Sequence, residues 1–558
     1  MNLEPPPALP ADRAGLSAYR SLLIGLAVLA LVLSGIYLSL ISRTDPWFRN
    51  TDMNIHNMVD ALSINSNVVP ARIEQPGFLP KYLLALDYRI RHYAGLLPVW
   101  NLEKFAASQD PLSEIRSLVK IGRWHSRGLV ILFILTAAGL SYAVIRKIET
   151  ACLTTILLCG SSGLLFHGLL TRPELLCAWL GGVLALGCTW QGVSSSTGQG
   201  QRLWLFLAGL CVGLATLAQW PGGFYLALCF AWCWLAAATT GRTETPALFH
   251  PAPSIFRSGL LPVISSLVVL WLAHCLSKSQ AAPGPAAAQR LRIVAMLVGT
   301  LPLLGLWSGR SRFWFFLLGR SRELALLGGG ALATLPLGYL LLRTVMTGPR
   351  ALDYLAGIFS LVFDPGPFLK GFLAAQPDIG REVLRLIQDS PFLLLIALAA
   401  TLAMVLARTI PSRLKAFTVL LLASALGVTL LLSFGHSHDQ YSLFIQVPLL
   451  LLVSLSLSAL ADGWARQPAA TNDPTWPVPV ILTATGVVLL TVYLRLRPMY
   501  DSFQPDGGRP VSDLTVTFLY EHNAHPRAYV QIMADRYGNR KQFVQVLERY
   551  LDDPANRY

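Results

Sequence analysis

The residues best suited to catalysis lie in one polar stretch, residues 43–127, which separates the first two apolar runs of the chain. Asp52, His56 and Asp60 recur there at intervals of four. A helix of 3.6 residues per turn therefore carries them on one face and apolar residues on the other. A carboxylate presented in this way can take a proton from a substrate hydroxyl as a general base. Asp52 is the central candidate for that role.

Other interpretations of the same residues remain open. An aspartate at the start of a helix can serve only as its N-cap, and Asp52 and His56 could share a divalent metal ion. Asp60 and Asp45 are the rival bases, although Asp45 precedes Pro46 and is more typical of a turn. The pattern predicts a helix that lies on the membrane surface, with its acids toward an aqueous cavity.

Basic groups near the ends of apolar runs could bind an anionic substrate. They are Arg123 and Arg127 before the second run, Arg172 in a short loop, and His436 and His438 in a later one. Cationic groups of this kind stabilise a leaving phosphate, because they face the negative charge that it gains. The alternatives are that Arg123 and Arg127 anchor a helix at the lipid headgroups, and that Arg172 pairs with Glu174 to fix a tight turn.

The elements that must hold these groups are membrane helices. Mean hydropathy is +0.52, and only 13% of the 558 residues are charged, against roughly 25% in soluble domains. Apolar runs of about 20 residues, the length that crosses a bilayer, recur along the whole chain. These features predict an all-α polytopic membrane protein.

The net charge of +14 does not indicate nucleic-acid binding, because many basic residues lie in short loops between apolar runs, where the positive-inside rule places them. The eight cysteines lie within or beside apolar runs, where a free cysteine behaves as a small hydrophobe. Neither a disulfide framework nor a thiolate metal site is therefore predicted.

The hydropathy pattern predicts about 13 membrane spans. They are residues 20–42, 128–145, 150–169, 174–191, 203–219, 222–239, 258–276, 291–308, 324–345, 391–408, 416–434, 442–461 and 477–494. A cytoplasmic N-terminus puts most arginine-rich loops on one side, which makes the loops 43–127 and 346–390 extracytoplasmic. Residues 1–19 are predicted to be a disordered cytoplasmic tail, residues 20–495 the transmembrane domain, and residues 496–558 a small helical extracytoplasmic appendage.

A series of motifs resembles, in its order, the GT-C superfamily of integral-membrane glycosyltransferases, in the branch with protein O-mannosyltransferases and the aminoarabinose transferase of lipid A. The motifs are NTDMNIHNMVDAL, QPGFLPKYLLALDY, GRWHSRGLVILF, TRPELLCAW, GLATLAQWPGGFYLAL and HSHDQYSLFIQVPLLLL. Asp52 matches the acid that this family places in a helix of the first loop. The chain departs from the family where Met53 follows Asp52 in place of a second acid, where Glu174 replaces a common aspartate, and where Gln219 replaces the usual lysine.

The resemblance implies a GT-C-like bundle whose first extracytoplasmic loop carries amphipathic helices. It implies an enzyme that moves a sugar, with inversion, from a polyprenyl-phosphate-linked donor to an acceptor at the periplasmic or outer face. Asp52 and Glu174 would be catalytic. Substrate binding would fall to Arg123, Arg127, Arg172, His436, His438 and Tyr441.

The implied partners are the lipid-linked donor, a lipid, glycan or protein acceptor, and membrane lipids, without nucleic acid, in a multi-pass protein of the bacterial inner membrane. No metal ligands are assigned, and the use of a divalent metal stays open. Two other classes also stay open. A secondary transporter or lipid flippase usually has repeated halves with ionisable groups at mid-membrane, and an O-antigen ligase or polymerase would use 346–390 as its catalytic loop.

Overall fold

The computed structural model describes residues 13–44, 46–48, 51–70, 77–195, 198–239, 321–363, 391–432, 442–465, 486, 513–520 and 525–557. Every regular element within these residues is helical. The chain is an all-α polytopic membrane protein, as the hydropathy predicts: seven described segments are long and apolar enough to cross a bilayer. An eighth is formed by α6 and α7, which meet at an angle of 61°.

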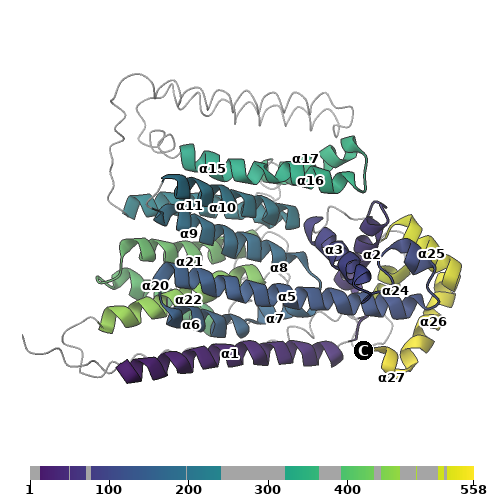
Figure 1. Ribbon diagram of the computed structural model, residues 1–558, viewed down its shortest axis with the longest axis horizontal. Coiled ribbons are helices and arrows are strands. Elements are labelled where there is room, and N and C mark those ends of the chain that lie inside the picture. The colour runs from purple at the N-terminus through teal and green to yellow at the C-terminus, as the bar shows by residue number, and fades with distance from the viewer. Residues whose placement is uncertain are drawn as a thin grey trace, which may run out of the picture.

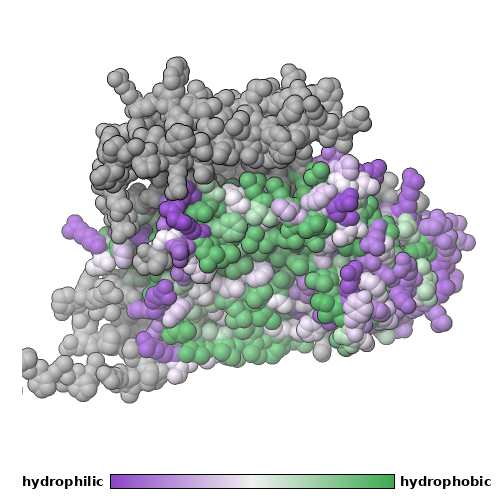
Figure 2. Space-filling view, turned by 45° about the horizontal axis from the view of Figure 1, so that its top comes forward, coloured by the Kyte–Doolittle hydropathy of each residue, from purple (hydrophilic) through white to green (hydrophobic). Residues whose placement is uncertain are grey.

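The candidate membrane helices, together with the shorter helix α17, lie side by side in one bundle (Figure 1). Its members are α1 (Arg13–Thr44), α5 (Pro111–Ile145), α6 (Ile148–Cys159), α7 (Ser162–Leu169), α8 (Pro173–Cys177), the π-helical η1 (Ala178–Ala185), α9 (Leu186–Ser194), α10 (Gly198–Ala218), the 3-10 turn η2 (Trp220–Gly223), α11 (Phe224–Thr239), α15 (Ser321–Leu332), α16 (Thr334–Arg343), α17 (Gly348–Phe363), α20 (Pro391–Leu406), α21 (Ser412–Leu432) and α22 (Ser442–Ala465). Figure 2 shows an apolar band over these helices, with hydrophilic residues gathered at both ends. Such a band is the surface that lipid chains cover.

Every predicted span that falls within the described residues coincides with a candidate span, with the bent pair, or with one of the shorter apolar helices Pro221–Ala236 and Phe392–Leu406. The predicted spans 258–276, 291–308 and, apart from residue 486, 477–494 lie outside the described residues. The total of about 13 therefore stays a prediction.

A second group of helices packs against one end of the bundle, and we call it the extramembrane body (Figure 1). Its members are α2 (Thr51–Asn65), α3 (Leu79–Tyr93), α4 (Leu102–Ala106), α24 (Asp513–Tyr520), α25 (Arg527–Tyr537), α26 (Arg540–Asp552) and α27 (Pro554–Arg557). The body thus combines the first loop with the C-terminal segment, although more than 400 residues separate them in the sequence.

Aromatic stacking and hydrogen bonds join the two parts of this body. The rings of Phe105 and Tyr529 stack with their centroids 5.6 Å apart, and both side chains are fully buried. The indole Nε1 of Trp47 donates a 2.9 Å hydrogen bond to the carbonyl oxygen of Asn556. The C-terminal helices are therefore part of the same packed core as the first loop. The sequence predicted a small helical appendage there and gave no indication of which segment it would pack against.

The long helix α5 connects the body to the bundle. It begins at Pro111 because Asp110 caps it, accepting a 3.2 Å hydrogen bond from the backbone N–H of Ser113. It ends at Arg146, which adopts a left-handed conformation with φ of 64°. Residues 111–127, predicted as loop, are therefore the first turns of the second span.

Two further predictions about helices need correction. The helix α1 begins at Arg13, inside the segment 1–19 that was predicted to be disordered. The helix α2 does not lie on the membrane surface with Asp60 toward water, because its side chains are buried from Asn54 to Asn65. The reason is that α3, α5 and α24 pack against it.

Candidate functional site

The start of α2 is attached to the turn between α7 and α8 by two asparagines. The Oδ1 atom of Asn54 accepts a 3.0 Å hydrogen bond from the backbone N–H of Thr171, and Nδ2 of Asn57 donates a 2.7 Å bond to the Thr171 carbonyl. The two asparagines are three residues apart and so lie on one side of the helix. The backbone N–H and the carbonyl of Thr171 are therefore both hydrogen-bonded, which fixes the turn that carries Arg172 and Glu174.

A cluster of three buried polar side chains lies next to this turn. A guanidinium nitrogen of Arg172 lies 3.6 Å from Oε1 of Glu174, and Nε2 of Gln219 donates a 3.4 Å hydrogen bond to the same oxygen. All three side chains are buried. The pairing of Arg172 with Glu174 that the sequence left open as an alternative to function is therefore present, and Gln219 joins it.

The C-terminal end of α10, next to Gln219, also touches the chain just before α3. Gly77 has φ of +152°, and a Cβ atom added there would lie 2.0 Å from the carbonyl oxygen of Ala218. Only glycine fits this approach, because its missing side chain allows both the conformation and the backbone contact. Gly77 of the first loop thus packs directly on the C-terminal backbone of α10.

The face of α2 that carries His56 and Asp60 is occupied by an ion pair. The Nζ atom of Lys81, on α3, is 2.7 Å from Oδ2 of Asp60, and both side chains are fully buried. The Nε2 atom of His56 lies 3.7 Å from the same oxygen, and its ring lies 5.6 Å from the ring of His525 in the C-terminal segment. Asp60, a rival base in the sequence, therefore has a cation as its close neighbour.

Asp52 lies in the first turn of α2, and the helix register places it one turn before His56. The Asp52 side chain lies outside the described part of the structure, and its role as base stays a prediction. His436, His438 and Tyr441 lie outside the described residues. Among the side chains that are described, no group of three His, Cys, Asp or Glu residues could hold a metal ion.

The structure divides the predicted phosphate ligands between two sides of α5. A narrow cleft against Arg172 and Thr171 is lined by Ser126 and Leu129 of α5. Arg127 instead lines a groove against α1, where its guanidinium stacks 4.6 Å from the ring centre of Trp124.

One turn earlier on the α1 side of the helix, Arg123 donates a 3.1 Å hydrogen bond from Nη2 to the carbonyl oxygen of Pro46. Its side chain is fully buried. The bond ties the first turns of α5 to the chain just after α1, so Arg123 has a structural role whether or not it also meets substrate.

Sequence reasoning missed several residues of this site: Asn54, Asn57, Lys81 and His525. The Asn-x-x-Asn spacing in α2 was a signal for the first two, because it places two amides on one helix face. Lys81 and His525 gave no signal of their own. Their importance comes from burial against α2, which no local pattern reveals.

Comparison with known proteins gives limited similarity. No family model and no curated protein sequence matches the chain. The oligosaccharyltransferase of Archaeoglobus fulgidus in the apo form is 15% identical with a TM-score of 0.45, over 91% of this chain and 60% of that one. The same archaeal enzyme, AglB, in complex with an inhibitory peptide and a dolichol-phosphate, is 16% identical with a TM-score of 0.47, over 91% and 59%.

A third structure, in which that oligosaccharyltransferase is tethered to an acceptor peptide, is 13% identical with a TM-score of 0.46, over 93% and 59%. The chain thus spans about 60% of the length of the structures it matches. At these identities and TM-scores, the function of this chain has to be argued from its own residues.

Proposed function

We propose that the chain is an integral-membrane glycosyltransferase that moves a sugar from a polyprenyl-phosphate-linked donor to an acceptor at the extracytoplasmic face. The observation that carries the proposal is the pair of hydrogen bonds that Asn54 and Asn57 make with the backbone of Thr171. It joins the helix that begins with Asp52 to the turn that bears Arg172 and Glu174. Motifs far apart in the sequence, which resemble those of GT-C enzymes, thereby meet at one end of the membrane bundle.

The chemistry that suits these parts is a single displacement with inversion. The acceptor hydroxyl attacks the anomeric carbon while Asp52 takes its proton, and the carrier phosphate leaves with the electrons of the broken C–O bond. Arg172 supports the leaving phosphate, since a cation there offsets the negative charge that develops. We propose that His436, His438 and Tyr441 make further contacts to the lipid-linked sugar donor. Glu174 is the second catalytic carboxyl group.

The acceptor is a lipid, a glycan or a protein with a free hydroxyl or amine, and the membrane is the bacterial inner membrane. The ion pair of Lys81 with Asp60 supports the choice of Asp52 over Asp60. A carboxylate held by a fully buried ammonium group at 2.7 Å is a poor proton acceptor, because the cation stabilises its charged form.

The test is transfer by purified protein in proteoliposomes that contain polyprenyl-phosphate-linked sugars, with released polyprenyl phosphate measured by mass spectrometry. Asp52→Asn keeps the shape and the capping ability of the side chain but removes the basic oxygen. Turnover should fall at least ~10²-fold, the scale of a general base. Asp535→Asn, at an exposed position of α25, is the matched control and should retain turnover.

Two results would contradict this assignment. Transfer by Asp52→Asn at the wild-type rate, together with loss of transfer in Glu174→Gln, would move the base to Glu174. Release of no carrier phosphate from any lipid-linked sugar, by a protein that stays folded, would reject the glycosyltransferase itself.

A further inference from the structure

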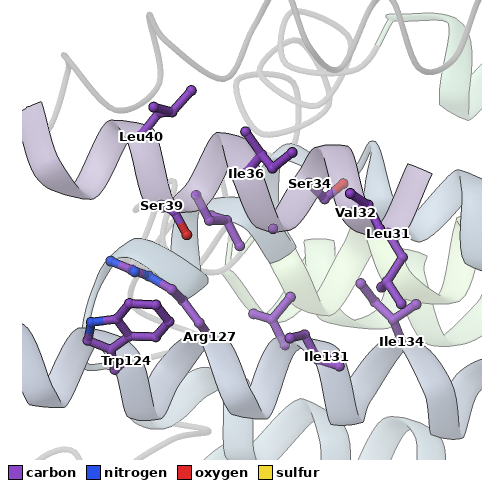
Figure 3. Close-up of a pocket in the computed structure, with 13 residues that line it drawn as sticks. Leu31, Val32, Ser34, Ile36, Ser39, Leu40, Trp124, Arg127, Ile131 and Ile134 are labelled. Atoms are coloured by element: carbon purple, nitrogen blue, oxygen red, sulfur yellow. The ribbon is translucent and has the colours of Figure 1, made fainter. Parts of the chain in front are cut away.

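A groove of about 460 Å³ runs between α1 and α5, on the side of α5 away from the narrow cleft beside Arg172. Figure 3 shows this groove. Its walls are apolar side chains of the two helices, among them Leu31, Ile36, Ile131 and Ile134. Both helices are candidate membrane spans, and Ile36 and Ile131 are exposed at the protein surface. The groove therefore opens toward the lipid and not toward water.

The length of the groove corresponds to one leaflet. It extends from Leu31 to Leu40 along α1 and from Trp124 to Ile134 along α5. At 1.5 Å per residue, each wall is roughly 15 Å long. That is about half of the ~30 Å hydrocarbon core. Because α1 ends at Thr44 and α5 enters from the extramembrane body, this half is the one next to that body.

A buried cation stands at the same end of the groove. Arg127 is only 6% exposed, and its guanidinium lies 4.6 Å from the ring centre of Trp124 (Figure 3). No hydrogen-bond acceptor or carboxylate in the described part of the chain pairs with it, and its Nε atom is buried without a partner. A buried charge without a counter-ion is costly at the membrane edge. An anion from outside the chain would remove that cost.

Further positive charge lies close by. Arg123 is one turn before Arg127 on α5, and nearby charge of the same sign makes the site more favourable for an anion. Trp124 is 56% exposed at the same level, as is common for tryptophans at the headgroup layer. The end of the groove thus combines cations, an interfacial aromatic ring and an apolar channel.

The groove and the cleft beside Arg172 lie on different sides of α5. Trp124, Arg127 and Ile131 face α1, whereas Ser126 and Leu129 face the turn with Arg172. At 100° per residue the centres of these two sets lie about 150° apart around the helix. A lipid in the groove is therefore separated from the cleft by the helix itself.

We infer that the groove binds an anionic phospholipid of the adjacent leaflet, with its phosphate on Arg127 and one acyl chain between α1 and α5. A phospholipid fits better than a polyprenyl carrier, because the channel spans one leaflet and lies away from the cleft. The inference does not rest on the proposed function. It would hold equally for a protein of another activity.

The test uses native mass spectrometry of the purified full chain with added phosphatidylglycerol. Arg127→Ala should lower the apparent affinity about tenfold or more, since a charge-assisted hydrogen bond is lost. Gly35→Leu should lower it as well by filling the channel. A Cβ atom at Gly35 meets nothing within 4 Å, so this change should not disturb folding.

Gly25→Leu is the matched control. It is on the same helix, also has nothing within 4 Å of an added Cβ, and lies outside the groove, so it should bind phosphatidylglycerol like the wild type. Equal binding by all four proteins would overturn the inference. Displacement of phosphatidylglycerol by an equal concentration of undecaprenyl phosphate would also overturn it, because the groove would then be a carrier site.

Discussion

The ammonium group of Lys81 lies 2.7 Å from the carboxylate of Asp60, and both side chains are completely buried between α3 and α2. The pair joins the two helices of the first loop in a place where the sequence suggested an open, water-facing acid. His56 and His525 lie beside it. The ion pair therefore lies at the contact between the first loop and the C-terminal segment.

Removing one partner of this ion pair should strongly destabilise the protein. Lys81→Met leaves the buried Asp60 carboxylate without its cation, at a cost of roughly 3–5 kcal/mol. Thermal unfolding in detergent measures this loss. Lys104→Met, at an exposed position of α4, should have little effect.

The double change Asp60→Leu/Lys81→Met should recover much of the lost stability, because it removes both charges at once. If Lys81→Met alone melts at the wild-type temperature, the pair does not stabilise the contact of α2 with α3.

The two asparagines that hold Thr171 should differ in their tolerance of aspartate. Asn54 acts as acceptor toward the Thr171 N–H, and its Nδ2 atom has no partner among the described residues. Asn57 acts as donor toward the Thr171 carbonyl. Both changes bury a carboxyl group. Asn57→Asp should nevertheless be less stable than Asn54→Asp by about 1–3 kcal/mol, since only at position 57 does the replaced NH2 group donate a hydrogen bond.

Melting temperatures of the two variants decide this prediction, and transfer rates should follow the same order if the turn positions Arg172. Equal melting temperatures would mean that the Thr171 peptide is not held in the way described.

The docking of the C-terminal helices should be needed for the stability of the first loop. Tyr529→Ala removes a fully buried ring that stacks on Phe105 and should cost roughly 3–5 kcal/mol. Amide hydrogen exchange in α2 should become faster in this variant, because α24 packs on α2. Tyr93→Ala is the control, since Tyr93 is 76% exposed. Unchanged exchange in α2 would show that the C-terminal segment and the first loop are independent.

The free energy of unfolding should decrease at acid pH, in part because Asp87 becomes protonated. Burial raises the pKa of Asp87, but the nearby His125 ring and the Arg91 guanidinium at 3.0 Å lower it by more, so that it lies below its ordinary value of 3.8. A carboxyl group whose pKa is lower in the folded state stabilises the fold at any pH above its pKa in the unfolded chain. This stabilisation is lost as the pH falls through its pKa in the folded protein.

The wild type should therefore melt at a higher temperature than Asp87→Asn from pH 4.5 upward, with the difference shrinking below about pH 3.8. Melting curves from pH 6 to pH 2 test this. Arg91→Gln should show a smaller pH dependence than the wild type. A difference between wild type and Asp87→Asn that grows toward low pH would have the wrong sign.

Much of the architecture follows from the sequence. Hydropathy runs predicted every candidate membrane span found within the described residues, because a span must satisfy its backbone internally and present apolar side chains along its whole length. The register of α2 was also predictable, since it depends only on the 3.6-residue period. Both properties are local, and each residue contributes to them through its own type.

The tertiary structure decided what these helices meet. His56 and Asp60 lie on one face of α2 in either case, but the same polar face suits open water or a buried ion pair equally well. Lys81 and His525 decide that this face is buried, and they lie 21 and 465 residues after Asp60 in the sequence. The division of α5 into a side that faces α1 and a side that faces Arg172 likewise depends on distant segments packing on it. Burial and charge compensation arise between segments, and a local pattern carries no information about which segment will be the partner.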